Sequence, residues 1–215
     1  MTATLLAAPS TSAQQRHAEP ADADRVARVA QALEANGFTV RVARDADEAR
    51  RLVLDLVPEG AEVNQGASVT LDSIGVTQEI AGSGRYDALR PRLWAMDRGT
   101  QGREIRKLGA APDVMLGSVH AVTQNGWLVT ASGSGSQLGP YASGAGKVVL
   151  VVGSQKIVTD IDEAFDRIET HAFPLEDQRA MDAYGMHSAI NKVLVTRADA
   201  PGRTTVIIVE QAIGF

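Results

Sequence analysis

The stretch of residues 117–152 constrains the fold most. It predicts a strand, a tight turn, a second strand, a small-residue loop, a short helix and a third strand without interruption. The turn is predicted at Asn125-Gly126, a pair that suits a two-residue hairpin loop because both residues tolerate positive φ. The last strand, residues 147–152, is a continuous apolar run beginning at Lys147. Such a run is typical of a strand that is covered on both faces of a parallel sheet.

Helical and strand patterns alternate along the rest of the chain. The predicted helices cover residues 22–36, 45–57, 100–108, 137–145, 160–170 and 174–185, and the predicted strands cover residues 38–42, 61–64, 113–116, 192–196 and 205–209. This alternation predicts an α/β fold with an open, mainly parallel sheet flanked by helices and with a helical segment on the N-terminal side.

The length of 215 residues fits one domain. We expect a single domain over residues 21–215, preceded by a disordered tail over residues 1–20 that is rich in Ala, Ser, Thr and Gln. The first nine residues lack the positive charge and the long apolar core of a signal peptide. Residues 82–96 are expected to cross the surface, with Trp94 and Met96 packing onto the core.

The composition narrows the classes of function. The chain has no cysteine, which excludes disulfides, thiolate catalysis and a cysteine-ligated cluster within it and suits the cytoplasm. Its net charge of −5 argues against a general electrostatic mode of nucleic-acid binding. No apolar run approaches the roughly 20 residues that span a bilayer. We therefore expect a cytoplasmic protein with neither a nucleic-acid partner nor a membrane span.

Two loops of small residues follow predicted strands. Gly66, Ser68 and Thr70 come after the strand at residues 61–64, and the loop at residues 132–136 (SGSGS) comes after the hairpin. Ligands of open α/β sheets bind at the carboxyl ends of strands, and small residues let a ligand approach the backbone closely. The loops therefore predict an anion-binding pocket. The alternative for the first loop is structural, because Ser68 or Thr70 can cap the following helix.

Two side chains near these loops are candidates for chemistry. Lys156 follows the apolar strand, and it either faces the same zone as the loops or lies exposed on its own loop. His120 lies in the apolar run before the hairpin turn, where it is either a hydrogen-bonded core residue or an acid–base group.

Several common site patterns are missing from the sequence. Gly133 and Gly135 follow a strand, but Leu138 stands where a dinucleotide-binding loop requires a third glycine. Ser134 has glycine one residue away on each side rather than two, so it does not form a hydrolase elbow. No Gly-Lys-Ser/Thr phosphate loop occurs. The four histidines, His17, His120, His171 and His187, lack the spacing of a metal site, and none is predicted.

Five blocks of the sequence resemble the LUD domain family, which includes LutC/YkgG-type proteins of lactate utilisation. They appear in the family's order and extend the similarity over roughly residues 22–215. The blocks are residues 66–75 (GASVTLDSIG), 118–132 (SVHAVTQNGWLVTAS), 135–138 (GSQL), 151–158 (VVGSQKIV) and 209–215 (VEQAIGF).

The resemblance implies a fold of the NagB/RpiA/CoA transferase-like superfamily and a site at its Gly/Ser/Thr-rich loops. By motif, a substrate would contact Gly66, Ser68, Thr70, Ser132, Ser134, Ser136 and Gln137, with Lys156 as a further contact. Lactate-utilisation members resemble components of an iron–sulfur-dependent system that oxidises L-lactate to pyruvate. One branch carries a cysteine cluster before the C-terminal strand. Residues 184–192 of this chain contain none, so an iron–sulfur cluster would lie on a partner subunit.

Three hypotheses follow. The first is an assisting subunit of a lactate oxidation complex, partnered by iron–sulfur subunits and holding a small anionic ligand. The second is a stand-alone enzyme acting on a sugar-phosphate, folate-like or CoA-linked substrate, with His120 and Lys156 as candidate catalytic residues. The third is a ligand-sensing or oligomerisation module, in which the partner is a second copy of the chain.

Overall fold

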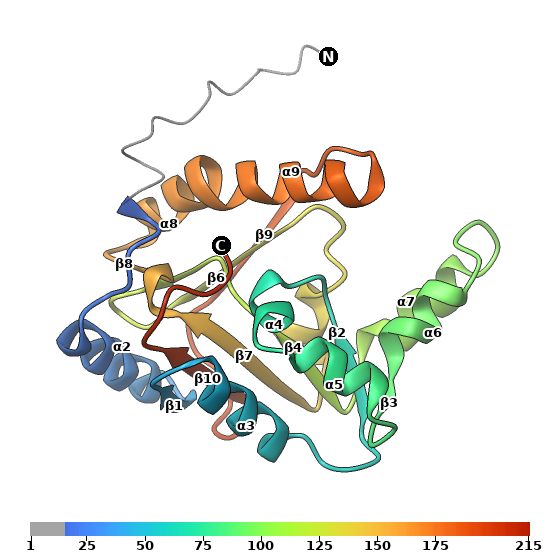
Figure 1. Ribbon diagram of the computed structural model, residues 1–215, viewed down its shortest axis with the longest axis horizontal. Coiled ribbons are helices and arrows are strands. Elements are labelled where there is room, and N and C mark those ends of the chain that lie inside the picture. Colours follow the sequence, from blue (N-terminus) through green and yellow to red (C-terminus); the bar gives the residue numbers. More distant parts are fainter. Residues whose placement is uncertain (1–15) are drawn as a thin grey trace.

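The computed structural model describes residues 16–215, and its centre is a six-stranded parallel sheet (Figure 1). The strand order is β1-β10-β7-β4-β2-β3, and every neighbouring pair is parallel. The strands are β1 (Thr39–Ala43), β2 (Glu62–Gln65), β3 (Asp87–Ala88), β4 (Val114–Gly117), β7 (Lys147–Gly153) and β10 (Thr204–Val209). The predicted α/β fold with a mainly parallel sheet flanked by helices is confirmed.

A second sheet of four strands lies over one end of the first. Its order is β8-β5-β6-β9, with β5 (Ala121–Thr123), β6 (Leu128–Ser132), β8 (Ile157–Val158) and β9 (Lys192–Thr196). Strand β6 is antiparallel to β5 and β9, whereas β8 is parallel to β5. The predicted strands at residues 192–196 and 205–209, which are neighbours in sequence, therefore belong to different sheets.

The helices begin where the sequence offers caps. The α-helices are α2 (Ala23–Ala35), α3 (Ala46–Leu56), α4 (Val69–Ser73), α5 (Val76–Gly82), α6 (Leu89–Ala95), α7 (Gly102–Ala110), α8 (Ile161–Arg167) and α9 (Phe173–Tyr184). The Asp22, Asp45 and Asp160 carboxylates accept hydrogen bonds from backbone N–H groups in the first turns of α2, α3 and α8. Short π-helices cover Pro140–Gly144 and Ile168–Ala172, and a 3₁₀ turn covers Ser154–Lys156.

The large sheet is covered on both faces. Val149 and Val151 of β7 pack into the cluster formed with α3, α4 and α5. Val148 and Leu150 point to the opposite face, where they meet α2 and the small sheet. The other face of the small sheet packs on α8. Successive residues of β7 are thus buried on opposite sides, as the continuous apolar run predicts.

The hairpin between β5 and β6 differs from the predicted two-residue turn. The loop holds residues 124–126, since Thr123 N–H donates to the Trp127 carbonyl (3.0 Å) and Gly126 N–H donates to the Thr123 carbonyl (2.8 Å). Gly126 has φ +77°, whereas no non-glycine residue among those described has positive φ. Asn125 therefore stays in the ordinary backbone region, and a three-residue loop with one left-handed glycine replaces the expected turn.

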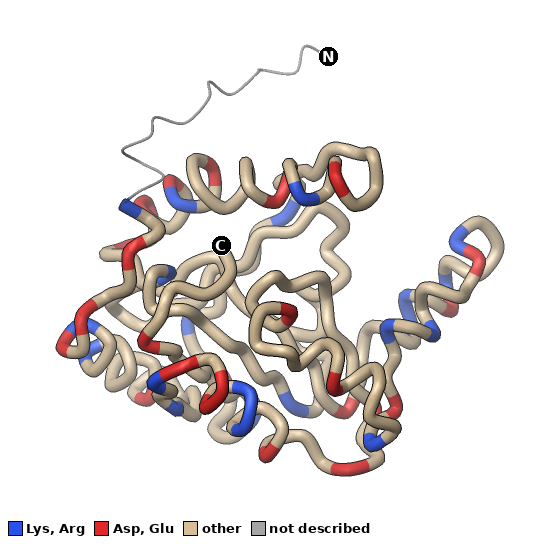
Figure 2. Tube along the Cα trace, viewed as in Figure 1, with Lys and Arg blue, Asp and Glu red and all other residues tan. Residues whose placement is uncertain are grey.

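Trp94 also lies elsewhere than expected. Residues 82–96 were predicted to pack Trp94 onto the core, but its side chain is 57% exposed. It belongs to α6, which with α7 forms an arm that projects from the body (Figure 1). Several of the arm's arginine and lysine residues are visible along this projection in Figure 2. Pro91 falls in the first turn of α6, where a missing N–H is tolerated, so a helix forms despite it.

The predicted tail over residues 1–20 lies mostly outside the described residues. Within the described part of it, His17 is buried, and its Nε2 lies 3.2 Å from Asp166 Oδ2. The ordered chain therefore includes residues on the N-terminal side of Ala21. Between residues 16 and 215, no helix is long and apolar enough to cross a membrane.

Candidate functional site

The carboxyl ends of β2, β4 and β7 meet at one edge of the large sheet, and a cleft of about 300 Å³ opens there. The end of β6 in the small sheet forms its other wall. All nine residues singled out from the sequence line this cleft: Gly66, Ser68, Thr70, His120, Ser132, Ser134, Ser136, Gln137 and Lys156. The structure thus brings the two small-residue loops together with both candidate catalytic side chains. That these residues bind a ligand stays a prediction.

Lys156 is the most enclosed of these side chains, with only 1% of its surface exposed. It ends the 3₁₀ turn that follows β7. Its Nζ donates to Thr70 Oγ1 (3.0 Å) and to Ser118 Oγ (3.1 Å). Among the described residues no carboxylate forms an ion pair with it. Burial, and then the positive charge of Arg167, set the pKa of Lys156 well below its ordinary value.

His120 follows β4 and is neutral for two reasons. Its Nδ1 accepts a hydrogen bond from the Ala131 backbone N–H (3.1 Å). A backbone amide can only donate, so Nδ1 carries no proton and the neutral ring holds it on Nε2. Burial, followed by the charges of Lys156 and Arg167, lowers the pKa of His120 to about 3. The geometry is compatible with both predictions for His120. The ring is hydrogen-bonded to the backbone of Ala131, as in a core residue, and it also lines the cleft, as an acid–base group would.

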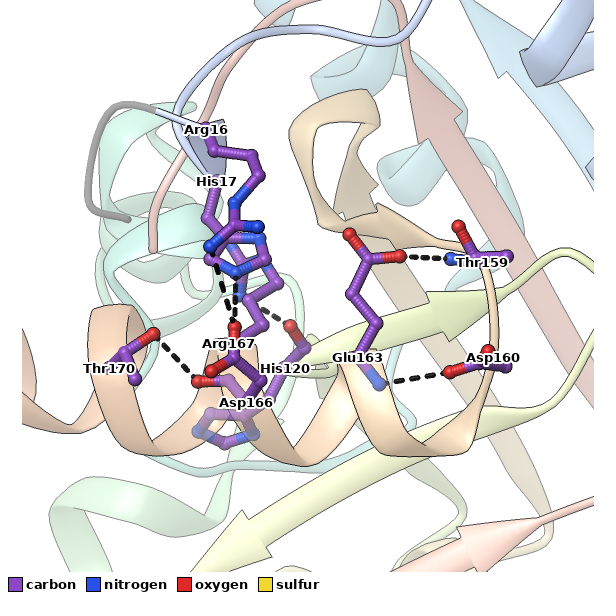
Figure 3. A network of polar contacts seen from close by, with 9 residues as sticks. All are labelled: Arg16, His17, His120, Thr159, Asp160, Glu163, Asp166, Arg167 and Thr170. Atoms are coloured by element: carbon purple, nitrogen blue, oxygen red, sulfur yellow. Dashed lines mark hydrogen bonds and ion pairs between the residues drawn. The ribbon is translucent and has the colours of Figure 1, made fainter. Parts of the chain in front are cut away.

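Arg167 of α8 supplies a fixed positive charge behind His120 (Figure 3). Its side chain is completely buried, and one guanidinium nitrogen donates to the His120 carbonyl oxygen. Its Nε and Nη2 have no hydrogen-bond partner, and it forms no ion pair within residues 16–215. Burial lowers its pKa to about 10, so the guanidinium stays protonated at neutral pH. An uncompensated buried charge is costly, and an anion in the cleft would offset it.

The first small-residue loop has a structural and a polar part. Ser68 Oγ accepts from the Leu71 backbone N–H (3.3 Å) and so caps α4. Thr70 Oγ1 instead points to Lys156 and lies 3.4 Å from Ser118 Oγ. Gly66 has no side chain, so its backbone is accessible at the cleft. Capping and site geometry therefore coexist in this loop.

The second small-residue loop is held by its own hydroxyls. Ser132 Oγ accepts from Gly135 N–H (2.8 Å) and donates to Gln137 Oε1 (3.0 Å). Ser134 Oγ and Ser136 Oγ lie 3.2 Å apart in a more exposed position. Ser132 and Gln137 thus fix the loop's shape, while Ser134 and Ser136 have hydroxyls accessible to a ligand.

The rim of the cleft carries an acidic group and the end of the chain. Glu176 of α9 is neutralised by Arg179, with two nitrogen–oxygen distances of 2.7 Å. Residues 210–215 fold back across the sheet edge, and Gln155 Nε2 donates to the carbonyls of Ile213 (2.9 Å) and Gly214 (3.0 Å). Phe215 consequently lines the cleft.

The family model of the LUD domain matches residues 26–209. The chain belongs to the LUD domain family. A crystal structure of a DUF162 family protein from Deinococcus radiodurans is similar in fold, with a TM-score of 0.50 and 12% sequence identity over 88% of this chain and 99% of that chain. No curated protein matches the chain.

Sequence reasoning missed Ser118, which lines the candidate cleft, and Arg167, which lies behind His120. Ser118 directly follows β4, so the rule that ligands gather at strand ends would have found it. Arg167 lies on the buried face of α8 together with Ala164 and Ile168. Its spacing from Ala164 and Ile168 is the sequence signal that could have found it.

The donor set of the LUD domain site suits an anion rather than a cation. Amine, hydroxyl and imidazole groups line the cleft, Arg167 lies behind His120, and the side-chain carboxylate at the rim, Glu176, is paired with Arg179. Over the part of the chain that the structure describes, no group of three or more His, Asp or Glu side chains is placed to hold a metal ion. The arrangement can bind an oxyanion and present two uncharged nitrogen groups, Lys156 and His120, to it.

Proposed function

We propose that this LUD domain binds a small organic acid of the lactate and pyruvate class and assists an iron–sulfur-dependent oxidation of L-lactate to pyruvate. The observation that carries the ligand class is the buried charge of Arg167 behind a cleft that Lys156 and several hydroxyls line. Arg167 has no carboxylate partner among the described residues. A ligand carboxylate would supply the missing negative charge.

The size of the cleft supports a small ligand. Its volume of about 300 Å³ is at the lower end of the range of ligand pockets, which runs to roughly 1,000 Å³. A three-carbon acid or a sugar phosphate fits that volume. A complete CoA thioester does not, although its acyl end does.

The assisting role rests on chemistry that this chain lacks. Oxidising an alcohol to a ketone needs an acceptor for two electrons, and a cysteine-ligated cluster cannot form in a chain without cysteine. The iron–sulfur centre would therefore belong to a partner subunit. Co-purification tests this role: recovery of the tagged protein alone, from lactate-grown cells that express candidate iron–sulfur partners, would contradict it.

Ligand binding is tested by thermal shift and calorimetry with L-lactate, pyruvate, sugar phosphates, CoA, acyl-CoA and folates. At about 100 times its dissociation constant, a ligand of the folded state raises the midpoint by roughly 5–10 °C for a domain of this size. We expect L-lactate or pyruvate to do so. Lys156→Met should abolish the shift and Ser134→Ala should reduce it. Lys107→Met on the exposed arm helix α7 is the matched control and should leave the shift unchanged. An equal response in all four proteins would contradict the proposed site.

The second candidate function is a stand-alone enzyme on a sugar-phosphate, folate-like or CoA-linked substrate. It is favoured by the presence of an amine and an imidazole that are both driven towards their neutral forms in one cleft. This function predicts turnover by the purified chain without partners. Binding without turnover, together with co-purifying iron–sulfur subunits, would decide for the assisting role.

A further inference from the structure

The hydrogen bonds of Lys156 match those of an uncharged amine. A neutral amine has two N–H donors and one lone pair, whereas an ammonium group has three donors. Nζ meets two acceptors, Thr70 Oγ1 and Ser118 Oγ, in a position that is 1% exposed. The neutral amine therefore satisfies both donors and keeps its lone pair, while an ammonium would leave one buried donor without a protein partner.

Lys156 is also adjacent to the open cleft rather than enclosed in the core, since it lines the same wall as His120 and Ser118. A structural lysine at such depth normally has a carboxylate beside it. This side chain has two hydroxyls instead, and the charge that acts on it is that of another cation, Arg167.

We propose that Lys156 is a nucleophile that forms an imine with the carbonyl carbon of a 2-oxo acid bound in the cleft. This inference rests on the proposed function, because it takes the same cleft and the same class of small acid. It adds a covalent, reversible step that distinguishes a 2-oxo acid from the corresponding 2-hydroxy acid, which has no carbonyl to attack.

The surrounding charges favour the nucleophilic form. Arg167 opposes a second positive charge nearby, and burial does the same, so the pKa of Lys156 lies well below its ordinary value. The other titratable groups that face the cleft do not reverse this. His120 is uncharged near neutral pH because its pKa is lowered to about 3, and Glu176 is paired with Arg179. The charge of Arg167 behind His120 and the imidazole of His120, which lines the cleft, remain to attract the ligand's carboxylate.

The reaction balances without a further reagent. The nitrogen lone pair attacks the carbonyl carbon, and the carbonyl π electrons move to oxygen, giving a carbinolamine. The nitrogen then loses both of its protons as the carbon–nitrogen double bond forms and the carbon–oxygen bond breaks. The leaving oxygen takes two protons and departs as water. Thr70 Oγ1 and Ser118 Oγ, which accept from Nζ and lie 3.4 Å apart, provide a path for those protons.

Reductive trapping tests the proposal on the wild-type protein. The chain is incubated with pyruvate and sodium borohydride, and its peptides are mapped by mass spectrometry. The sequence has four lysines, and Lys107, Lys147 and Lys192 are exposed. We expect the Lys156 peptide to gain the mass of pyruvic acid less one oxygen atom, at ten or more times the level found at any exposed lysine. Excess L-lactate should suppress this gain, and Lys156→Met should lack it while Lys107→Met retains it.

The outcomes separate the imine from simple binding. Calorimetric binding of pyruvate without labelling of Lys156 would overturn the imine and leave the proposed ligand class intact. Labelling spread equally over the four lysines would overturn it too, since the reaction would then be non-specific. Absence of binding by both pyruvate and L-lactate would overturn the proposed function itself, and the imine with it. Because the mapping uses unmodified protein, the result does not depend on whether Lys156→Met folds.

Discussion

Lys156 shows how two hydroxyls and a buried arginine determine the protonation state of a single amine. The hydroxyls of Thr70 and Ser118 accept its protons but carry no charge that would stabilise an ammonium ion. Arg167 stays charged at neutral pH because a guanidinium is far harder to deprotonate than an amine. Between two buried cations, the amine is therefore the one that loses its proton.

This residue should leave a signature in stability. In the unfolded chain a lysine stays protonated up to about pH 10.4, whereas the pKa of native Lys156 is well below its ordinary value. Between those limits the unfolded state binds one proton more than the native state, so stability rises with pH. Urea denaturation should show a free energy of unfolding that rises more steeply between pH 7 and 9.5 in wild type than in Lys156→Met, by up to about 1.4 kcal/mol per pH unit.

Lys107→Met serves as the control for this measurement and should keep the wild-type slope. The range stops below pH 10 because burial raises the pKa of Tyr141. Above that pH the unfolded chain loses a tyrosine proton that the native state keeps, and stability would fall. Equal slopes in wild type and Lys156→Met would show that native Lys156 is protonated.

The sequence patterns predicted most residues that line the candidate cleft but not the buried charge behind it. Small residues at strand ends indicated both loops, because a ligand can approach the backbone closely only where side chains are small. The depth of Lys156 was not predictable, since its cover comes from α4, the Ser118 segment and residues 210–215, which are distant in sequence. Arg167 was missed because α8 contains four charged residues, and sequence alone does not show which of them the fold turns inward.

Among the elements, the hairpin loop 124–126 is tied to α2. Asn36 Nδ2 at the end of α2 donates to the carbonyls of Asn125 (2.9 Å) and Gly126 (3.1 Å). A Cβ on Gly126 would lie 2.7 Å from the Ala32 carbonyl carbon and 2.8 Å from its oxygen. The loop thus requires glycine for both its backbone angle and its space.

Gly126→Ala should therefore lower the free energy of unfolding by more than backbone strain alone would. Gly60 has nearly the same angle, φ +76°, but nothing lies within 4 Å of its missing Cβ. Gly60→Ala should lower the free energy of unfolding by about 1–2 kcal/mol through the left-handed backbone. Gly126→Ala should lower it by roughly 3 kcal/mol or more, because α2 must also shift. Urea denaturation of the two variants compares them directly, and equal losses would disprove the contact.

The C-terminal segment is a wall of the site rather than a tail. Gly214 has φ +63°, and a Cβ there would lie 2.2 Å from Thr70 Oγ1 and 2.9 Å from Thr70 N. Gly214→Ala should push the segment off Thr70 and open the pocket around Lys156. We expect at least about a tenfold loss of affinity for the small acid, equal to roughly 1.4 kcal/mol, as measured by calorimetry.

Gly202→Ala is the matched control for the C-terminal segment. Gly202 has φ +82° in the turn before β10, and its missing Cβ has no neighbour within 4 Å. This variant should lose some stability to backbone strain and keep its ligand affinity. If both variants bind as wild type does, residues 210–215 do not shape the pocket.

Element prediction succeeded where patterns are local and failed where the partner is remote. Strands β7 and β10 were correctly predicted to be buried because both of their faces are apolar. The α6–α7 arm was not predicted, since α6 packs against β2, which is distant in sequence, and against α7, and leaves Trp94 exposed. The hairpin loop gained one residue because Thr123 binds Trp127 through both backbone and side chain, which moves the turn.

At the scale of the whole molecule, the two sheets share one core. Val122, Leu128 and Ile157 from the small sheet pack in the same cluster as Leu150 and Ile208 of the large sheet. Neither sheet can lose that cluster without exposing the other, so the domain should unfold in one cooperative step.

Two probes, one local to the small sheet and one that reports the whole chain, check this cooperativity. Trp127 lies beside β6 with the Arg197 guanidinium 4.3 Å from its ring centroid, so its fluorescence reports the small sheet. Trp94→Phe removes the other tryptophan, which is exposed. In urea the Trp127 fluorescence and the far-UV circular dichroism of this variant should give superimposable curves. Separated midpoints would mean that the small sheet unfolds independently of the rest of the domain.

The strand order has a consequence for how the chain is made. Strand β1 pairs with β10 alone, and β10 separates it from β7 in the sheet. While the ribosome is still translating the middle of the message, α2 and β1 have emerged but have no strand to join. The nascent chain therefore carries β1 without a partner strand until residues 204–209 leave the exit tunnel. Val40 and Ala43, which are buried in the folded domain, lack their cover during that time. A ribosome that stalls before that point would expose an unpaired strand, and a premature stop would release a chain with an open sheet edge. Chaperones and proteases recognise such surfaces.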